Sequence, residues 1–238
     1  MLTRPQNDKD LILKNLEETY YIENFVSKED IQELCDIFNN SDNKVYKKTG
    51  PITSTITDFK IPVMRRITDK IHNLYPNCEI YHGMYFYVDY PHIIHNDDNK
   101  EWPLIYKAFN IPLKYEGNEM PYLCFFDQVY LDGPSKFFNG EKNVETHYNT
   151  CVYDYKDVLG KSKEDIDSHI KEKYLTHLKD EWLRGLSFNS AHHWKPGNTI
   201  VFDSCRLHCA SDFRKNVKSK LGISIFTKLK SNPQYRLK

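Results

Sequence analysis

Apolar and polar positions near the start of the chain follow the periods of a short strand and then of an amphipathic helix. Residues 20–25 form an apolar, aromatic run that predicts a strand. Ser27 follows as a candidate helix N-cap, and Asp30 occupies the position of a capping-box acid. The apolar face of the helix is then formed by Ile31, Leu34, Cys35 and Phe38, which recur at helical spacing. A strand leading into a helix is therefore expected.

A second helix and a long strand are predicted after this first unit. From about Pro62 apolar residues repeat every three to four positions, and Pro76 follows the last of them. Residues 79–90 are dense in aromatic and β-branched side chains, so they predict a strand that runs toward His95. Residues 99–117 are less regular, and we expect a loop or an insertion there.

The second half of the chain returns to strands after a helical stretch. Residues 121–133 predict a strand, and apolar residues spaced by fours predict one long helix or two short helices over residues 163–186. Residues 198–204 and 220–229 predict two further strands, separated by a polar loop. The pattern as a whole predicts a mainly β fold, with helices packed outside a mainly antiparallel sheet.

Composition narrows the class of protein. The 238 residues suit one domain, and 39% hydrophobic with 14% aromatic residues exclude a disordered chain. The formal net charge is zero, so no nucleic-acid partner is expected. No stretch has the length and apolarity of a signal peptide or of a membrane span, and none of the six cysteines forms a C-x-x-C pair. We expect a cytoplasmic protein with reduced thiols and no membrane partner.

His95 and Asp97 form an H-x-D pattern after the strand at residues 79–90. Residues two apart on an extended chain point to the same side, so both side chains can reach one ion. Two imidazoles and one carboxylate on one face of an octahedron hold iron and leave positions open for small ligands. Alone the pattern is weak, because a histidine beside acidic residues is more often simply solvated.

His208 and two lysines supply further candidates. A Pro-Gly turn at residues 196–197 precedes a predicted buried strand, and His208 follows the end of that strand. The plainer interpretation of His208 is a hydrogen-bonded histidine of the core. Lys220 opens the last strand and can either protect a sheet edge or bind the carboxylate of a diacid. Lys218 competes for the second role, because two positions apart on a strand share a face.

The order and spacing of these residues resemble the double-stranded β-helix (jelly-roll, cupin-like) 2-oxoglutarate- and iron(II)-dependent oxygenases, in particular the prolyl 4-hydroxylase and phytanoyl-CoA-hydroxylase branch. In this family a Tyr precedes the first ligand His as Tyr87 precedes His95, by eight positions. A Pro-Gly strand leads to the second ligand His, as residues 196–202 lead to His208. An anchoring Arg or Lys follows, as Lys220 does twelve positions after His208 and Lys218 ten positions after it.

The resemblance implies a set of roles. His95, Asp97 and His208 would bind Fe(II), and Lys220, or else Lys218, would bind the far carboxylate of 2-oxoglutarate. Tyr87 and Tyr130 would contact the same co-substrate, although a plain core position suits Tyr130 equally well. Some relatives place a Ser or Thr two residues past the anchor, where this chain has Gly222. That difference leaves a second carboxylate contact open.

The resemblance also implies an activity and a domain plan. The enzyme would use O2 and 2-oxoglutarate to hydroxylate an unactivated C–H bond, forming succinate and CO2. Its substrate would be an amino acid, a peptidyl residue such as proline, or another small molecule. Residues 1–238 would form one oxygenase domain, with an N-terminal strand and helix region (1–78), a jelly-roll core (79–230) and a helical insertion at about 141–193.

Two other classes of function remain open at this point. A cupin-like module could bind a metal or ligand without catalysis, and a zinc-dependent hydrolase could use the same three side chains. Other candidate ligands are weaker. His192 and His193 are adjacent and point to opposite sides of an extended chain, and Glu145 with His147 lies in a polar stretch.

Overall fold

The architecture comes from a computed structural model that describes residues 6–46, 51–97, 105–132, 136–137, 151–152 and 158–230. The helices are α1 (Gln6–Lys14), α2 (Lys28–Asn39), α3 (Pro62–Leu74), α4 (Ser168–Tyr174) and α5 (Asp180–Leu183). The strands are β1 (Tyr20–Ile22), β2 (Lys44–Val45), β3 (Ile52–Thr55), β4 (Cys78–Val88), β5 (Ile105–Gly117), β6 (Tyr122–Val129), β7 (Lys136–Phe137), β8 (Cys151–Val152), β9 (Phe188–His193), β10 (Thr199–Asp203), β11 (Arg206–Ala210) and β12 (Val217–Leu229). None of the helices described is long and apolar enough to cross a membrane.

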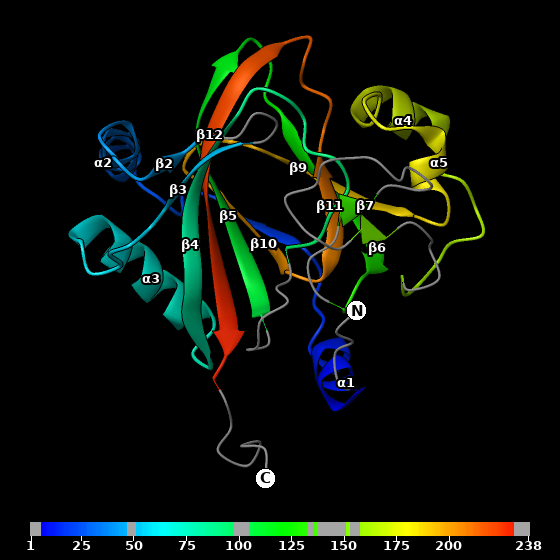
Figure 1. The fold of residues 1–238 in the computed structure, drawn as a ribbon, viewed down its shortest axis with the longest axis horizontal. Coiled ribbons are helices and arrows are strands. Elements are labelled where there is room, and N and C mark those ends of the chain that lie inside the picture. Colours follow the sequence, from blue (N-terminus) through cyan, green and yellow to red (C-terminus); the bar gives the residue numbers. More distant parts are fainter. Residues whose placement is uncertain are drawn as a thin grey trace.

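Two antiparallel sheets form the core. The larger sheet has the order β1-β10-β5-β12-β4-β3-β2, and the smaller has the order β11-β6-β9. Figure 1 shows α2 and α3 on the outer side of the larger sheet, and α4 and α5 beside the smaller one. A buried cluster contains Ala108, Ile200 and Phe202 of the larger sheet together with Leu123 and Phe125 of the smaller. The two sheets therefore pack against each other through their inner faces.

The two N-terminal helices form as the sequence predicts. Ser27 caps α2, because its side-chain oxygen accepts a hydrogen bond of 3.1 Å from the backbone N–H of Asp30. The carboxylate of Asp30 pairs with Arg66 on α3 and so ties the two helices together. Leu34 and Phe38 of α2 are buried in the cluster on the outer face of the larger sheet, as the helical spacing indicates.

The expectation of a loop at residues 99–117 is wrong for residues 105–117. Residues 105–117 form β5, a central strand that pairs with β10 and β12. Polar residues at buried positions hide the strand in the sequence, since Lys107 and Asn110 are both buried. Pro112 also argues against a central strand, and it lies where the register with β12 shifts, which is where a sheet tolerates proline.

The polar loop expected before the last strand contains β11, which the sequence pattern does not reveal. The predicted helical stretch at residues 163–186 forms two short helices, α4 and α5. The last part of the segment expected to be an insertion forms β9, which pairs with β6 in the smaller sheet. Pairing with strands that are distant in the sequence therefore decides the local structure of both β11 and β9.

Trp194 fills the interior of the barrel directly beneath the last strand. Its side chain is fully buried, and its indole N–H donates a hydrogen bond of 2.9 Å to the Oδ1 atom of Asn110. A Cβ atom at Gly222 would lie 2.7 Å from the ring of Trp194 and 2.8 Å from that of Phe86. Trp194 therefore occupies the space that a side chain at position 222 would need.

We expect Gly222→Ser to destabilise the protein by about 1–3 kcal/mol, the usual cost of overpacking a filled core. The exposed Lys218→Ser on the same strand serves as the control and should change stability little. Chemical denaturation of both variants measures the effect. Equal stabilities would show that Trp194 gives way easily, and would contradict this account of position 222.

Candidate metal centre

His95 and His208 are brought together by their own backbones. The N–H of each residue donates a hydrogen bond of 2.9 Å to the carbonyl oxygen of the other, which forms an isolated antiparallel bridge. His208 lies on β11, and the segment around His95 pairs with its free edge. The ring centroids are consequently 4.2 Å apart, so both imidazoles face the same point between the sheets.

The outer nitrogens of both rings are held by carbonyl oxygens. Nδ1 of His95 lies 2.7 Å from the carbonyl oxygen of Ile93, and Nδ1 of His208 lies 3.0 Å from that of Arg206. Since a carbonyl oxygen only accepts hydrogen bonds, each Nδ1 carries the proton. In the neutral form of each ring this tautomer leaves the lone pair on Nε2, which is the arrangement that metal-binding histidines require.

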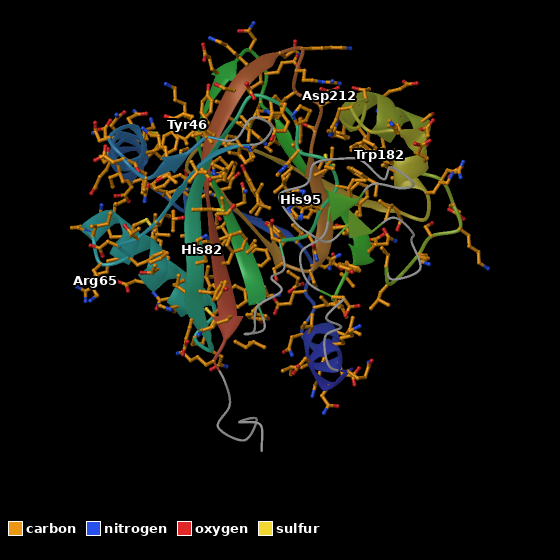
Figure 2. The ribbon with its side chains drawn as sticks, in the orientation of Figure 1. Tyr46, Arg65, His82, His95, Trp182 and Asp212 are labelled. Carbon is orange, nitrogen blue, oxygen red and sulfur yellow. The ribbon has the colours of Figure 1, made fainter. Side chains whose placement is uncertain are left out.

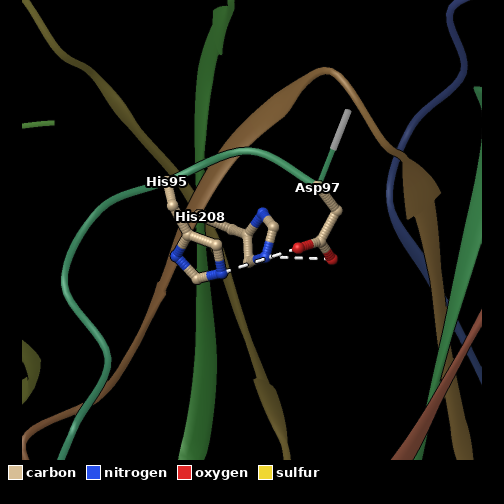
Figure 3. A group of neighbouring side chains, drawn as sticks. All are labelled: His95, Asp97 and His208. Carbon is tan, nitrogen blue, oxygen red and sulfur yellow. Dashed lines mark ion pairs between the residues drawn. The ribbon is translucent and has the colours of Figure 1, made fainter. Parts of the chain in front are cut away.

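Asp97 completes the group that Figure 3 shows. Its carboxylate oxygens lie 3.7 Å from Nε2 of His95 and 3.5 Å from Nε2 of His208. One ligand atom from each of the three residues lies within 4.8 Å of the others, so a single ion can contact all three. Burial raises the pKa of Asp97, and the nearby His208 opposes this rise. A bound cation would favour the charged carboxylate.

The turn that carries Asp97 is fixed on both sides. The N–H of Asp97 donates a hydrogen bond of 2.8 Å to the carbonyl oxygen of Ser204, in the turn between β10 and β11. Asn96 is fully buried, and its side-chain amide donates a hydrogen bond of 3.0 Å to the carbonyl oxygen of Tyr130. Asn96 is a positioning residue that the sequence gives no signal to find.

A buried ion pair supports the turn between β10 and β11. Nζ of Lys107 lies 2.6 Å from Oδ1 of Asp203, and 3.1 Å from Oε2 of Glu17 in the N-terminal segment. Asp203 also accepts a hydrogen bond of 2.8 Å from the N–H of Glu17. These contacts hold the end of β10, and with it Ser204 and the backbone of Asp97, in place.

Lys220 is a second buried lysine, but it has no acidic partner among the described residues. Its side chain points between the sheets, where Nζ lies 4.9 Å from the ring centroid of Trp194 and 5.1 Å from that of Phe213. Burial lowers its pKa to about 8, and the thiols of Cys124 and Cys209 oppose this shift. Burial of an ammonium without an acidic partner is costly, and such a group favours the approach of an anion.

Lys220 and the metal group lie along one interior surface. The ring of Trp194, which contacts the ammonium of Lys220, belongs to the buried cluster that also contains Phe125 and Phe202. The ring of His208 lies 5.6 Å from that of Phe125 and 4.7 Å from that of Phe202. One ligand between the two sheets can therefore approach both a metal ion and a cation.

The expectation that Lys218 shares a face with Lys220 is wrong. The register between β12 and β5 shifts between Val217 and Ser219, so Lys218 is an extra residue in a β-bulge. Its side chain is 78% exposed and pairs with Glu116 at 3.2 Å, whereas Lys220 is buried. The bulge interrupts the alternation of the strand, and only Lys220 faces the interior.

The two candidate tyrosines lie in different buried clusters. Tyr87 is opposite Leu221, and both pack in the cluster beneath α2 and α3, so Tyr87 lies on the outer face of the larger sheet. Tyr130 is buried in the cluster on the outer side of the smaller sheet. The expected contact of Tyr87 with a co-substrate is thus corrected, because strand alternation directs this side chain away from the interior between the sheets. The buried position of Tyr130 fits the plain core interpretation that was equally expected for it.

The weaker candidate ligands include two adjacent histidines on β9. The ring of His192 stacks on that of Tyr21, whereas the ring of His193 packs against that of Tyr122, so the two histidines face opposite sides of β9 as expected. Glu145 and His147 lie outside the described residues.

No family model and no curated protein matches the sequence. Solved structures do match the fold. The α-ketoglutarate-dependent epimerase SnoN from nogalamycin biosynthesis aligns over 94% of this chain and 84% of its own, with a TM-score of 0.52 and 9% identity. HygX from Streptomyces hygroscopicus, with nickel and 2-oxoglutarate bound, aligns over 98% and 90%, with a TM-score of 0.51 and 8% identity. EvdO2 from Micromonospora carbonacea var. aurantiaca aligns over 95% and 92%, with a TM-score of 0.50 and 10% identity.

These structures confirm the predicted fold. The chain has the double-stranded β-helix fold of the 2-oxoglutarate/iron oxygenases, with β11, β6 and β9 in its smaller sheet. Since SnoN is an epimerase, the fold alone does not specify a reaction. The residues between the sheets decide the chemistry.

We expect the protein to bind Mn(II), an air-stable substitute for Fe(II), with one ion per chain. Removal of an outer-shell partner typically weakens metal binding ~10–100-fold, so loss of a ligand in His208→Ala should weaken it at least about 100-fold. Isothermal titration calorimetry measures the affinity. The exposed His193→Ala on the same sheet is the control, and a His208→Ala variant that binds as tightly as this control would refute the site.

Proposed function

We propose that the protein is an Fe(II)- and 2-oxoglutarate-dependent oxygenase. One observation supports this function above all: a group of two imidazoles and a carboxylate shares an interior surface with a buried lysine that has no acidic partner within the part of the chain that the structure describes. A 2-oxo diacid fits both parts, since its 2-oxo acid end chelates a metal while its other carboxylate needs a cation.

The donor set fits a redox-active iron. His95, Asp97 and His208 supply two neutral nitrogens and one anionic oxygen, which is the facial arrangement used by non-haem Fe(II) oxygenases. An ion held by these three side chains would have positions left for small ligands such as a 2-oxo acid and O2. When bound, iron supplies the oxidative decarboxylation of 2-oxoglutarate, in which one oxygen atom of O2 enters succinate and the other enters the substrate.

The side chains of this protein contribute binding, orientation and exclusion of water. Lys220 balances the charge of the distal carboxylate, and the rings of Trp194 and Phe213 shield this contact from water. Phe125 and Phe202 form an apolar wall beside His208. That wall favours transfer of oxygen to a bound substrate over reaction with solvent.

The overall reaction that we propose is hydroxylation of a C–H bond. The substrate, O2 and 2-oxoglutarate would give the alcohol, succinate and CO2, so the four-electron reduction of O2 is balanced by oxidation of both organic molecules. The substrate class that we propose is an amino acid, a peptidyl residue or another small molecule. A zinc-dependent hydrolase would use the same triad, but the buried ammonium of Lys220 has no role in that chemistry.

We expect the purified protein to form succinate from 2-oxoglutarate in the presence of Fe(II) and O2, slowly without substrate and faster with the correct substrate. Asp97→Ala should abolish this activity because it removes the anionic ligand. Succinate is measured by chromatography, with exposed Asp180→Ala as the control. A wild-type protein that binds 2-oxoglutarate but forms no succinate with any substrate pool would support a non-catalytic binding module.

We expect Lys220→Ala to raise the KM for 2-oxoglutarate by roughly 10–100-fold, because charge-assisted contacts of this kind contribute about 1.5–3 kcal/mol. The wild-type KM should also rise above about pH 8, where the free protein loses the ammonium proton that binding requires. Below that pH the ammonium is already charged, so the KM should stay level. Steady-state kinetics across pH measures both effects.

Lys218→Ala is the matched control for this experiment, because its ammonium belongs to the same strand but is exposed to solvent. Its KM and pH profile should equal those of the wild type. A larger effect of Lys218→Ala than of Lys220→Ala would overturn the assignment of the anchor.

A further inference from the structure

A row of side chains crosses the inner face of the larger sheet beside the metal group. Phe202 of β10 is opposite Ala108 of β5, Ala108 is opposite Phe226 of β12, and Phe226 is opposite His82 of β4. Directly opposite residues on paired strands point to the same face of a sheet. At one end of the row the ring centroid of Phe202 lies 4.7 Å from that of His208. The row therefore begins at a metal-binding candidate and ends at His82.

Two observations place His82 on the inner face of the sheet. Its ring is stacked on that of Phe226, with centroids 6.2 Å apart and planes 6° apart, and Phe226 packs against the buried cluster between the sheets. The next residue, Gly83, points the other way, since a Cβ atom there would lie 2.7 Å from the ring of Phe59 on the outer side. Figure 2 labels His82 on β4 and His95 beside the smaller sheet. His82 therefore faces the same interior as the metal group.

The His82 end of the row is open, although it faces the interior. His82 and Met84 are consecutive inner-face residues of β4, and both are only partly buried, as is Phe226. At the other end Phe202 and Ala108 are each 1% exposed. Neighbouring strands are about 4.8 Å apart, so Phe226 is roughly 10 Å from Phe202 across the sheet, a distance that one small molecule spans. A ligand on the open part of the row can thus reach toward the metal group.

The imidazole of His82 is available to such a ligand. Within the described part of the chain it interacts with the rings of Phe226 and Tyr81, and neither of its nitrogens has a hydrogen-bond partner there. Burial lowers the pKa of His82, so the ring is neutral at pH 7. A neutral imidazole offers one hydrogen-bond donor and one acceptor.

The side chains around the open end are uncharged. The row itself carries two phenyl rings, one methyl group and the neutral imidazole. The next row along the strands is equally uncharged and contains Asn110, Ser224 and Met84. In the other direction Nζ of Lys228 pairs with Oε2 of Glu79 at 3.2 Å, so these two charges compensate each other. An ionised group on this surface would lose hydration without gaining a counter-charge, so the surface suits an uncharged ligand.

We propose that His82, Met84 and Phe226 bind the substrate, and that the substrate is an uncharged, mostly apolar small molecule that forms a hydrogen bond with His82. This assignment rests on the proposed function for the reaction, and it narrows the substrate class. A free amino acid is disfavoured, because its ammonium and carboxylate groups would lie among uncharged side chains. His82 is then a specificity-determining residue that holds the substrate beside the metal group.

Proton NMR of small probes tests this surface in protein loaded with Mn(II) and 2-oxoglutarate, because the paramagnetic ion broadens the signals of molecules that bind near it. N-methylcyclohexanecarboxamide is the uncharged probe, and cyclohexanecarboxylate and cyclohexylammonium are charged probes with the same ring. We expect saturable broadening of the amide, with affinity at least about tenfold above that of either ion, because burial of an unpaired charge is costly. Equal binding of the amide and the ions, or no binding of the amide at millimolar concentration, would overturn the proposal.

Two variants at position 82 separate the hydrogen bond from the ring. His82→Phe keeps a ring and removes the hydrogen bond, so it should raise the Kd of the amide probe roughly three- to tenfold. His82→Gln keeps a donor and an acceptor and should stay closer to the wild type. The exposed His169→Phe on α4 is the control, and its Kd should equal that of the wild type. If His82→Phe binds the amide as tightly as this control does, His82 has no role in recognition.

Failure of this inference can be told apart from failure of the proposed function. If the wild type forms succinate with a substrate pool but binding of the amide does not depend on His82, the inference falls and the function stands. If no succinate forms with any substrate pool but the amide binds near the metal in a His82-dependent manner, the binding surface stands and the oxygenase function falls.

Discussion

The candidate metal centre depends on one pair of main-chain hydrogen bonds, those between His95 and His208. They connect a segment that lies outside the long strands to the free edge of β11, and they place two imidazoles side by side before any ion is bound. The carbonyl oxygens of Ile93 and Arg206 then orient both rings toward Asp97. Because backbone hydrogen bonds hold both histidines in place, the site is preorganised, and metal binding need not supply the free energy of ordering the segment.

The second constraint is the burial of a positive charge without a fixed counter-charge. Lys107 shows how this protein normally buries a lysine, since its ammonium pairs with Asp203 at 2.6 Å. Lys220 lacks such a pair among the described residues, and a β-bulge at Lys218 directs it inward. An apolar side chain would be more stable at this position in the ligand-free protein, and the proposed function explains this cost by the carboxylate that Lys220 would bind. Local instability at a binding site is offset by the surrounding core.

The sequence predicts many of the helices and strands, but fewer of the side-chain contacts in the interior. Periodicity finds α2 and α3, and the order of H-x-D, Pro-Gly and the last histidine brings forward the three residues that the structure collects at one point. It misses β5 because buried polar residues such as Lys107 and Asn110 interrupt the pattern and find partners only across the sheets. Spacing also places Tyr87 at the co-substrate, whereas strand alternation directs it outward.

The central claim is that one metal ion and one 2-oxo diacid bind together between the two sheets. Anaerobic titration of the Fe(II)-loaded protein with 2-oxoglutarate, followed by visible absorbance, tests it directly, since chelation of Fe(II) by a 2-oxo acid produces a metal-to-ligand charge-transfer band. The account predicts a band that saturates with one 2-oxoglutarate per iron. A protein that binds Fe(II) and 2-oxoglutarate without developing this band would contradict it, because the two ligands would then occupy separate sites.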